Sequence, residues 1–83
     1  MVVEIIYLRL RENAPQGACE VSIQPTPSGK NDVHLSVQDD RRSMIFYFDR
    51  GVEGGRQRAI ERAVEWAGNH GVDKIYVEYS PDV

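Results

Sequence analysis

One segment, residues 56–71, constrains the fold more than any other, because its apolar residues recur at the spacing of an α-helix. At 100° per residue, one stripe holds Ala59, Ile60, Ala63, Val64 and Ala67, with Trp66 at its margin. The alanines are small enough to let the helix axis approach a neighbouring layer closely. Gly71 can end the helix in a left-handed conformation. The segment therefore predicts one amphipathic helix packed on a sheet.

Five other segments alternate apolar and polar residues, which is the period of a half-buried strand. The predicted strands are residues 1–11, 19–24, 33–38, 43–49 and 74–80. The order β-β-β-β-α-β predicts one α+β domain over residues 1–83, an antiparallel sheet of four to five strands with the helix on one face. Residues 43–49 are apolar on both sides, which indicates a central strand. The last strand follows a helix, so it can lie parallel to the fourth or to another strand.

Composition and charge narrow the class of protein. The chain has 83 residues, 41% hydrophobic and 28% charged, which is typical of one ordinary globular domain. Its net charge of −3 argues against a non-specific nucleic-acid binder. The single cysteine, Cys19, rules out an internal disulfide and fits a reducing compartment. A cytoplasmic protein is expected, with no membrane-spanning segment and no signal peptide, because Glu4 and Arg9 interrupt the apolar start.

No complete catalytic or metal-binding set is found, so neither an enzyme nor a cofactor is expected. Cys19 should point into the core and His34 away from it, which separates a nucleophile from its base. The acids at turns lack the spacing of a calcium loop. These are Asp32, Asp39, Asp40 and Asp49.

Two surfaces could bind a partner. On the sheet face away from the helix, we expect an interleaved set of aromatic and basic side chains, namely Tyr7, Arg9, Arg11, His34, Tyr47 and Tyr76. Such a face is typical either of a protein interface or of a stacking surface for single-stranded nucleic acid. The outer face of the helix presents Arg58, Glu61, Arg62 and Glu65. The glycine-rich turn 51–55, beside two arginines, raises the separate question of an anion at the helix start.

Residues 51–77 combine a glycine turn, an alanine-rich helix and a closing strand after a meander of short strands. In this order of elements the chain resembles several small phage-encoded inhibitors, including anti-CRISPR proteins. The resemblance implies a non-catalytic protein that blocks an effector complex through surface contacts. The leading hypothesis is therefore a small inhibitor that binds a protein or nucleoprotein complex. The alternatives are a nucleic-acid-binding module and a homo-oligomeric subunit that pairs through the doubly apolar stretch 2–6, for example as a homodimer.

Overall fold

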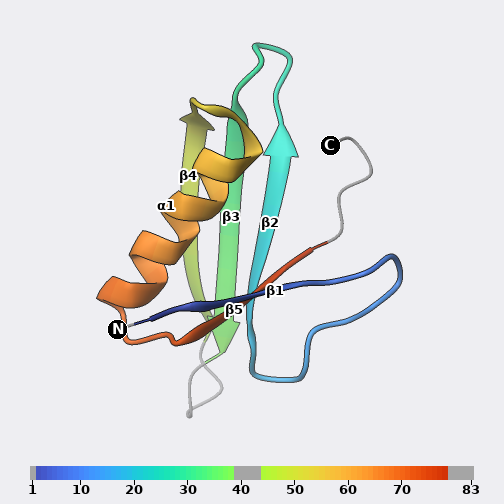
Figure 1. The fold of residues 1–83 in the computed structure, drawn as a ribbon, viewed down its shortest axis with the longest axis vertical. Coiled ribbons are helices and arrows are strands. Elements are labelled where there is room, and N and C mark those ends of the chain that lie inside the picture. Colours follow the sequence, from blue (N-terminus) through green and yellow to red (C-terminus); the bar gives the residue numbers. More distant parts are fainter. Residues whose placement is uncertain (1, 39–43, 79–83) are drawn as a thin grey trace.

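Five strands and one helix make up the described part of the chain, residues 2–38 and 44–78 of a computed structural model (Figure 1). Their bounds are β1 (Glu4–Tyr7), β2 (Cys19–Pro25), β3 (Asn31–Gln38), β4 (Met44–Val52), α1 (Gly55–Asn69) and β5 (Lys74–Val77). The strands form one sheet, and α1 lies on one of its faces. The predicted α+β class and element order are confirmed. No helix among these residues is both long and apolar enough to cross a membrane.

The sheet is mixed, in the order β1-β5-β2-β3-β4. β3 runs antiparallel to both β2 and β4, whereas β5 lies between β1 and β2 and is parallel to each. The predicted antiparallel arrangement therefore holds for β2, β3 and β4, and the last strand lies parallel to β1 and β2, strands other than the fourth. The cause is α1, which crosses over the sheet from β4 and returns the chain in the direction of β2. β4, predicted as a central strand, is an edge strand.

The core lies between α1 and the sheet, as the alanine stripe predicts. Ala59, Ala63 and Ala67 are fully buried against the sheet. The opposing side chains come from three neighbouring strands and are also buried, namely Val21, Val33, Leu35, Ile75 and Val77. Because alanine adds so little volume, the larger sheet residues fill the space between the two layers.

Glycines mark both ends of α1. Gly54, with φ 97°, precedes the helix, and Gly71, with φ 74°, follows it. A β-carbon at Gly54 would lie 2.9 Å from the Cβ atom of Arg58, so this turn needs glycine for space as well as for its positive φ. The helix spans residues 55–69 rather than the predicted 56–71. Gly51, predicted in the turn, belongs to β4.

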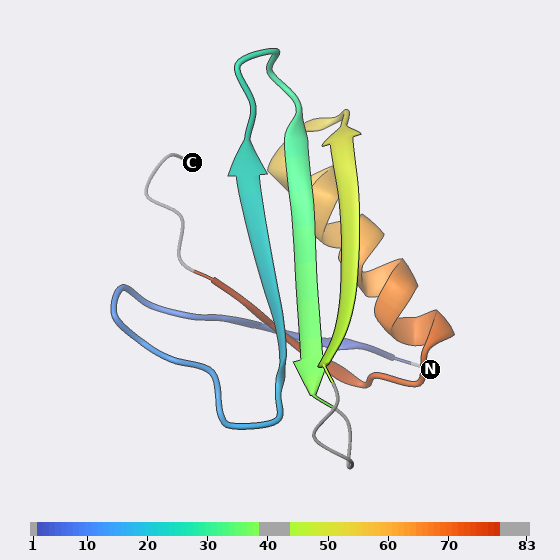
Figure 2. The same cartoon turned by 180° about the vertical axis from the view of Figure 1, so that it is seen from behind.

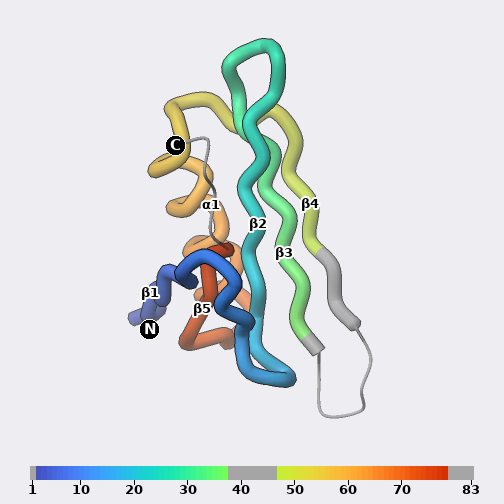
Figure 3. The backbone as a smooth tube through the Cα atoms, turned by 90° about the vertical axis from the view of Figure 1, so that its right-hand side faces the viewer, coloured from blue at the N-terminus to red at the C-terminus, as the bar shows by residue number. Residues whose placement is uncertain are grey.

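The sheet curls toward the helix at its β1–β5 end. In Figure 1, β1 and β5 cross the upright strands β2, β3 and β4 at a large angle. Figure 3 shows β1 and β5 on the same side of those three strands as α1. The opposite face of β2, β3 and β4 has no helix over it (Figure 2). Within the described residues, the backbone of α1 lies close to that of every strand of the sheet except β1. One end of the helix-bearing face is thus left uncovered.

Candidate functional site

A groove of about 850 Å³ lies between α1 and the uncovered strand β1 and is open to solvent. We call it the α1/β1 groove. One wall comes from β1, with Ile5 half-buried and Tyr7 56% exposed. The other wall comes from α1. The residues that line it are Ile5, Tyr7, Arg56, Gln57, Ile60, Glu61, Val64 and Glu65.

The helical repeat explains why an apolar groove carries charges at its rim. Arg56, Ile60 and Val64 are four residues apart and share one flank of α1, the flank that faces β1. Their neighbours Glu61 and Glu65 lie one step further toward solvent. On β1, Ile5 and Tyr7 point to the same side because side chains alternate along a strand. The groove therefore has an apolar floor and a polar outer border.

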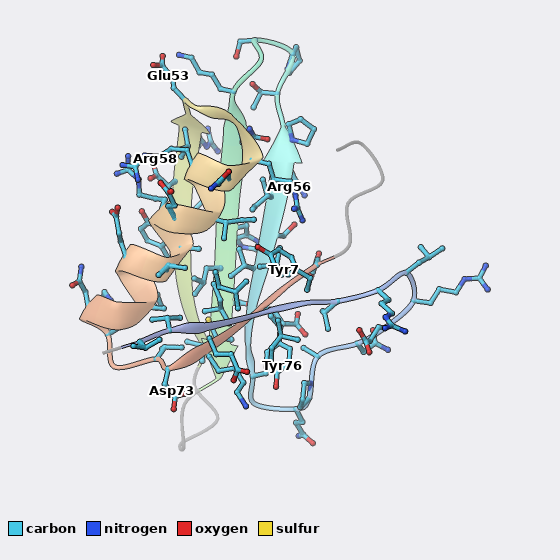
Figure 4. All side chains as sticks on the ribbon, viewed as in Figure 1. Tyr7, Glu53, Arg56, Arg58, Asp73 and Tyr76 are labelled. Atoms are coloured by element: carbon cyan, nitrogen blue, oxygen red, sulfur yellow. The ribbon has the colours of Figure 1, made fainter. Side chains whose placement is uncertain are left out.

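Arg56 is the unpaired cation of this groove. Its guanidinium carbon lies 5.9 Å from the centre of the Tyr7 ring, a distance typical of a cation–π contact. Its Nε atom is shielded from solvent and has no hydrogen-bond partner in the described part of the chain. Figure 4 shows Arg58 on the other side of α1 from Arg56 and Tyr7. Because Arg56 forms no ion pair with a described residue, a carboxylate brought by a ligand would be favoured beside its guanidinium group.

The two acids at the border are held by Arg58 instead. One guanidinium nitrogen of Arg58 lies 3.2 Å from a carboxylate oxygen of Glu61 and 3.2 Å from one of Glu65. Hydrogen bonds with Glu65 and then Glu61 raise the pKa of Arg58. Because Arg58 holds both acids, Arg56 has no acidic partner within the groove.

The opposite flank of α1, toward β4, is closed. Tyr47 stacks on Trp66 at 5.6 Å between ring centres, and Trp66 stacks on His70 at 4.1 Å. The Tyr47 hydroxyl donates to Asp49 at 3.2 Å, and Arg62 lies 3.6 Å from the same carboxylate oxygen. Burial, followed by the nearby charge of Asp49, raises the pKa of Tyr47. In the described part of β4, these side chains fill the space beside this flank of α1.

Two tyrosines predicted on the open sheet face lie on the helix side. Tyr47 pairs with Leu35 and Tyr7 pairs with Val77, and both partners face α1. The two residues of each pair share a face of the sheet. The alternation in β4 could not decide this orientation, because its aromatic residues fall on both sides. Tyr7 now belongs to the α1/β1 groove and Tyr47 to the stack with Trp66.

The arginines predicted beside those tyrosines lie beyond the sheet. β1 ends at Tyr7, and the chain turns over residues 9–12, where the Glu12 amide donates to the Arg9 carbonyl at 2.9 Å. Arg11 has a positive φ of 65° in this turn. The strand predicted over residues 1–11 is thus too long, and Arg9 and Arg11 are exposed loop residues.

The open sheet face carries a different cluster from the one predicted. His34, which is predicted there, contacts the ring of Phe48 edge-on at 5.7 Å, and Arg50 lies 5.1 Å from the centre of that ring. Phe48 is 48% exposed. Tyr76 also belongs to this face but sits on β5, across β2 and β3 from Phe48. Sequence reasoning missed Phe48 and Arg50 because it assigned β4 the reverse orientation.

The residues with catalytic potential are kept apart. Cys19 is 3% exposed in the core, and burial followed by the charge of Glu20 raises its pKa to about 11. His34 is on the other face of the sheet, as predicted. Asp32 accepts a hydrogen bond from the Gly51 amide, whereas Asp39 and Asp40 lie outside the described residues. Among residues 2–38 and 44–78, no three His, Cys, Asp or Glu side chains are grouped as metal ligands.

The side chains of the two arginines that follow the glycine turn do not come together beside it. Arg56 turns toward Tyr7, and Arg58 toward Glu61 and Glu65. Neither arginine side chain is therefore assigned to an anion at this turn.

Comparisons of the chain with protein-family models, curated proteins and solved structures gave no significant match. The resemblance to phage-encoded inhibitors therefore stays a prediction. The α1/β1 groove is the candidate site because it combines apolar surface with an unpaired cation.

Proposed function

We propose that this chain is a non-catalytic protein-binding module that acts as an inhibitor by holding a segment of its partner in the α1/β1 groove. The observation that carries this proposal is an open apolar groove whose cation, Arg56, lacks an acidic partner. Binding energy in protein interfaces is concentrated in such apolar pockets, with polar residues around them.

The surroundings of the groove supply the rest of an interface. A stable protein contact buries about 800 Å² on each partner, more than a groove of this length offers alone. The exposed acids Glu61 and Glu65, with Arg58 beside them, extend the groove onto the outer face of α1. Of the helix residues predicted to contact a partner, Glu61 and Glu65 line the groove. Arg58 pairs with both acids from outside the groove, and Arg62 faces Asp49 on the closed flank.

A capture experiment with matched variants tests the proposal. Val64→Arg places a charge in the groove floor, and Ser22→Arg places the same charge on β2 at the open sheet face. A partner enriched from the native host's lysate should be retained by wild type and by Ser22→Arg. With that partner purified, Val64→Arg should weaken binding more than about tenfold in calorimetry, as expected for a blocked hot spot. Equal affinity of the two variants would contradict the assignment.

A second candidate, binding of single-stranded nucleic acid, has support from the cluster of His34, Phe48 and Arg50. An exposed aromatic ring beside an arginine is a surface on which bases stack. The variant that tests it is Phe48→Ala, because Tyr47 is engaged with Trp66 under the helix. A mobility shift at low salt that is lost in Phe48→Ala would favour this candidate, and no shift by wild type would exclude it.

A further inference from the structure

The α1/β1 groove is bordered by backbone groups as well as side chains, because β1 is an edge strand. In its parallel ladder with β5, the amides of Glu4 and Leu8 donate to the carbonyls of Asp73 and Val77. Backbone groups of alternate residues point to the same side of such a ladder. The N–H and C=O groups of Ile5 and Tyr7 therefore point away from β5, toward the free edge.

The residues with outward backbone groups also have side chains in the groove. Ile5 and Tyr7 line it, facing Ile60 and Val64 on α1. A strand added to this edge would pair with their backbones and place every second side chain against the flank of the helix.

The length of the groove fits a short extended segment. From residue 56 to residue 64, α1 rises about 12 Å at 1.5 Å per residue. Five residues of strand span about 13 Å from the first Cα atom to the last, and β1 itself has 4 residues. Three side chains of such a segment face the groove, two of them toward Ile60 and Val64 and one toward Arg56.

The charges favour an acidic residue at one end of that segment. Arg56 lies over Tyr7 without an acidic partner, while Glu61 and Glu65 are held by Arg58. A carboxylate facing the groove beside Tyr7 would meet a cation and accept its hydrogen bonds.

Resting on the proposed function, we infer that the partner contributes an extended segment that adds as a strand to the free edge of β1. Its groove-facing residues are two apolar side chains followed by a carboxylate that pairs with Arg56. The β4 edge is less suitable, because Tyr47, Asp49 and Arg62 close the helix flank there.

Synthetic peptides test this inference without the natural partner. The probe is an octapeptide of alternating valine and threonine with glutamate at one end. It is made in two versions, with glutamate at the N-terminus or at the C-terminus, so that both directions of the added strand relative to β1 are tested. One control replaces glutamate with lysine, and another has the same composition with the valines in one block. Binding is followed by NMR titration, and amide exchange is measured with and without saturating peptide.

The alternating acidic peptide should slow exchange of the Ile5 and Tyr7 amides at least about tenfold, whereas the Ile6 amide, already directed at β5, should change little. The lysine peptide should bind about tenfold more weakly. Arg56→Gln should abolish this preference, and Arg50→Gln, a cation on the other sheet face, should preserve it.

Two substitutions at Ile5 separate the contribution of its backbone amide to peptide binding from that of its side chain. Ile5→Ala shortens the side chain and keeps the amide, whereas Ile5→Pro also removes an amide that does not bond to β5. The proline variant should bind the peptide about tenfold more weakly than the alanine variant, with circular dichroism confirming that both fold. If the proline variant fails to fold, the exchange measurement on wild type decides.

Three results would overturn the inference that a strand from the partner adds to β1. Peptides that shift Ile60 and Val64 without protecting Ile5 and Tyr7 would refute strand addition and leave the groove as the binding site. Strand addition would also be refuted if the peptide with its valines in one block bound as tightly as the alternating peptide. Protection of these amides that grows with protein concentration, without peptide, would assign the edge to a second copy of the chain. The proposed function itself fails only if Val64→Arg leaves partner binding unchanged.

Discussion

The thiol of Cys19 offers a single-site probe of the packing between helix and sheet. It is 3% exposed, and its pKa is raised from 9.0 to about 11. Only the thiolate reacts with an alkylating reagent. At pH 8, a thiol with a pKa of 9.0 is about one-tenth ionised and one with a pKa of 11 about one-thousandth, so folding lowers the reactive fraction about a hundredfold. Burial of the sulfur should slow the reaction further.

Labelling with iodoacetamide, followed by mass spectrometry with and without denaturant, measures this protection. The control is Ser28→Cys in a Cys19→Ala background, because Ser28 is exposed in the loop between β2 and β3. The control thiol should react at nearly the same rate in both conditions. A native Cys19 labelled within tenfold of the unfolded rate would refute its placement in the core.

The same shift makes stability depend on pH. Because the folded pKa of Cys19 lies above the unfolded one, its contribution is complete below pH 9 and is lost between pH 9 and about pH 11. Two pKa units correspond to about 3 kcal/mol of unfolding free energy. Between pH 8 and pH 11, wild type should lose more stability in urea than Cys19→Ala, by up to this amount. Parallel curves for the two proteins would contradict the raised pKa.

Three further substitutions test the packing and can be measured by urea denaturation. Ala63→Leu should lower the unfolding free energy by about 1–3 kcal/mol, because a fully buried alanine leaves no room for a larger side chain; an unchanged midpoint would refute the close approach of α1. Gly54→Ala should cost about 2 kcal/mol through its positive φ and the nearby Cβ atom of Arg58, and a neutral effect would contradict this turn geometry. Tyr47→Phe should cost about 1 kcal/mol through the lost hydrogen bond to Asp49, whereas no loss would argue against that bond.

The sequence predicts the elements well because their periodicity is a local property. The alanine stripe fixed the buried face of α1, and alternation placed Val21, Leu35 and Ile75 in the core. Both patterns depend only on residues a few positions apart. They identify which face is apolar without information about neighbouring strands.

Strand order and the orientation of β4 depend on contacts between distant residues. Tyr47 and Phe48 are both aromatic, so alternation cannot tell which one lies beneath the helix. The orientation of β4 is set by Trp66, which stacks on Tyr47 beneath the helix and leaves Phe48 exposed on the other face. A local pattern does not contain this choice.

The α1/β1 groove was also missed, because it arises from the curl of the sheet. Ile60 and Val64 both belong to the predicted apolar stripe, but only Ile60 is buried, whereas Val64 is half-buried. A stripe of alanines with larger apolar side chains beside it predicts that one flank of the helix is apolar. It does not show whether a strand covers that flank.

The place of β1 in the sheet also affects the order of folding. β1 pairs only with β5 among the described strands, and its first residue, Glu4, lies opposite Lys74. Contacts between residues so far apart in sequence form slowly, and on the ribosome this pair cannot form until residues 74–77 have emerged. The β2–β3–β4 meander can assemble earlier from local contacts. The groove should thus be among the last features to form, so a nascent chain would have most of its sheet before it could engage a partner.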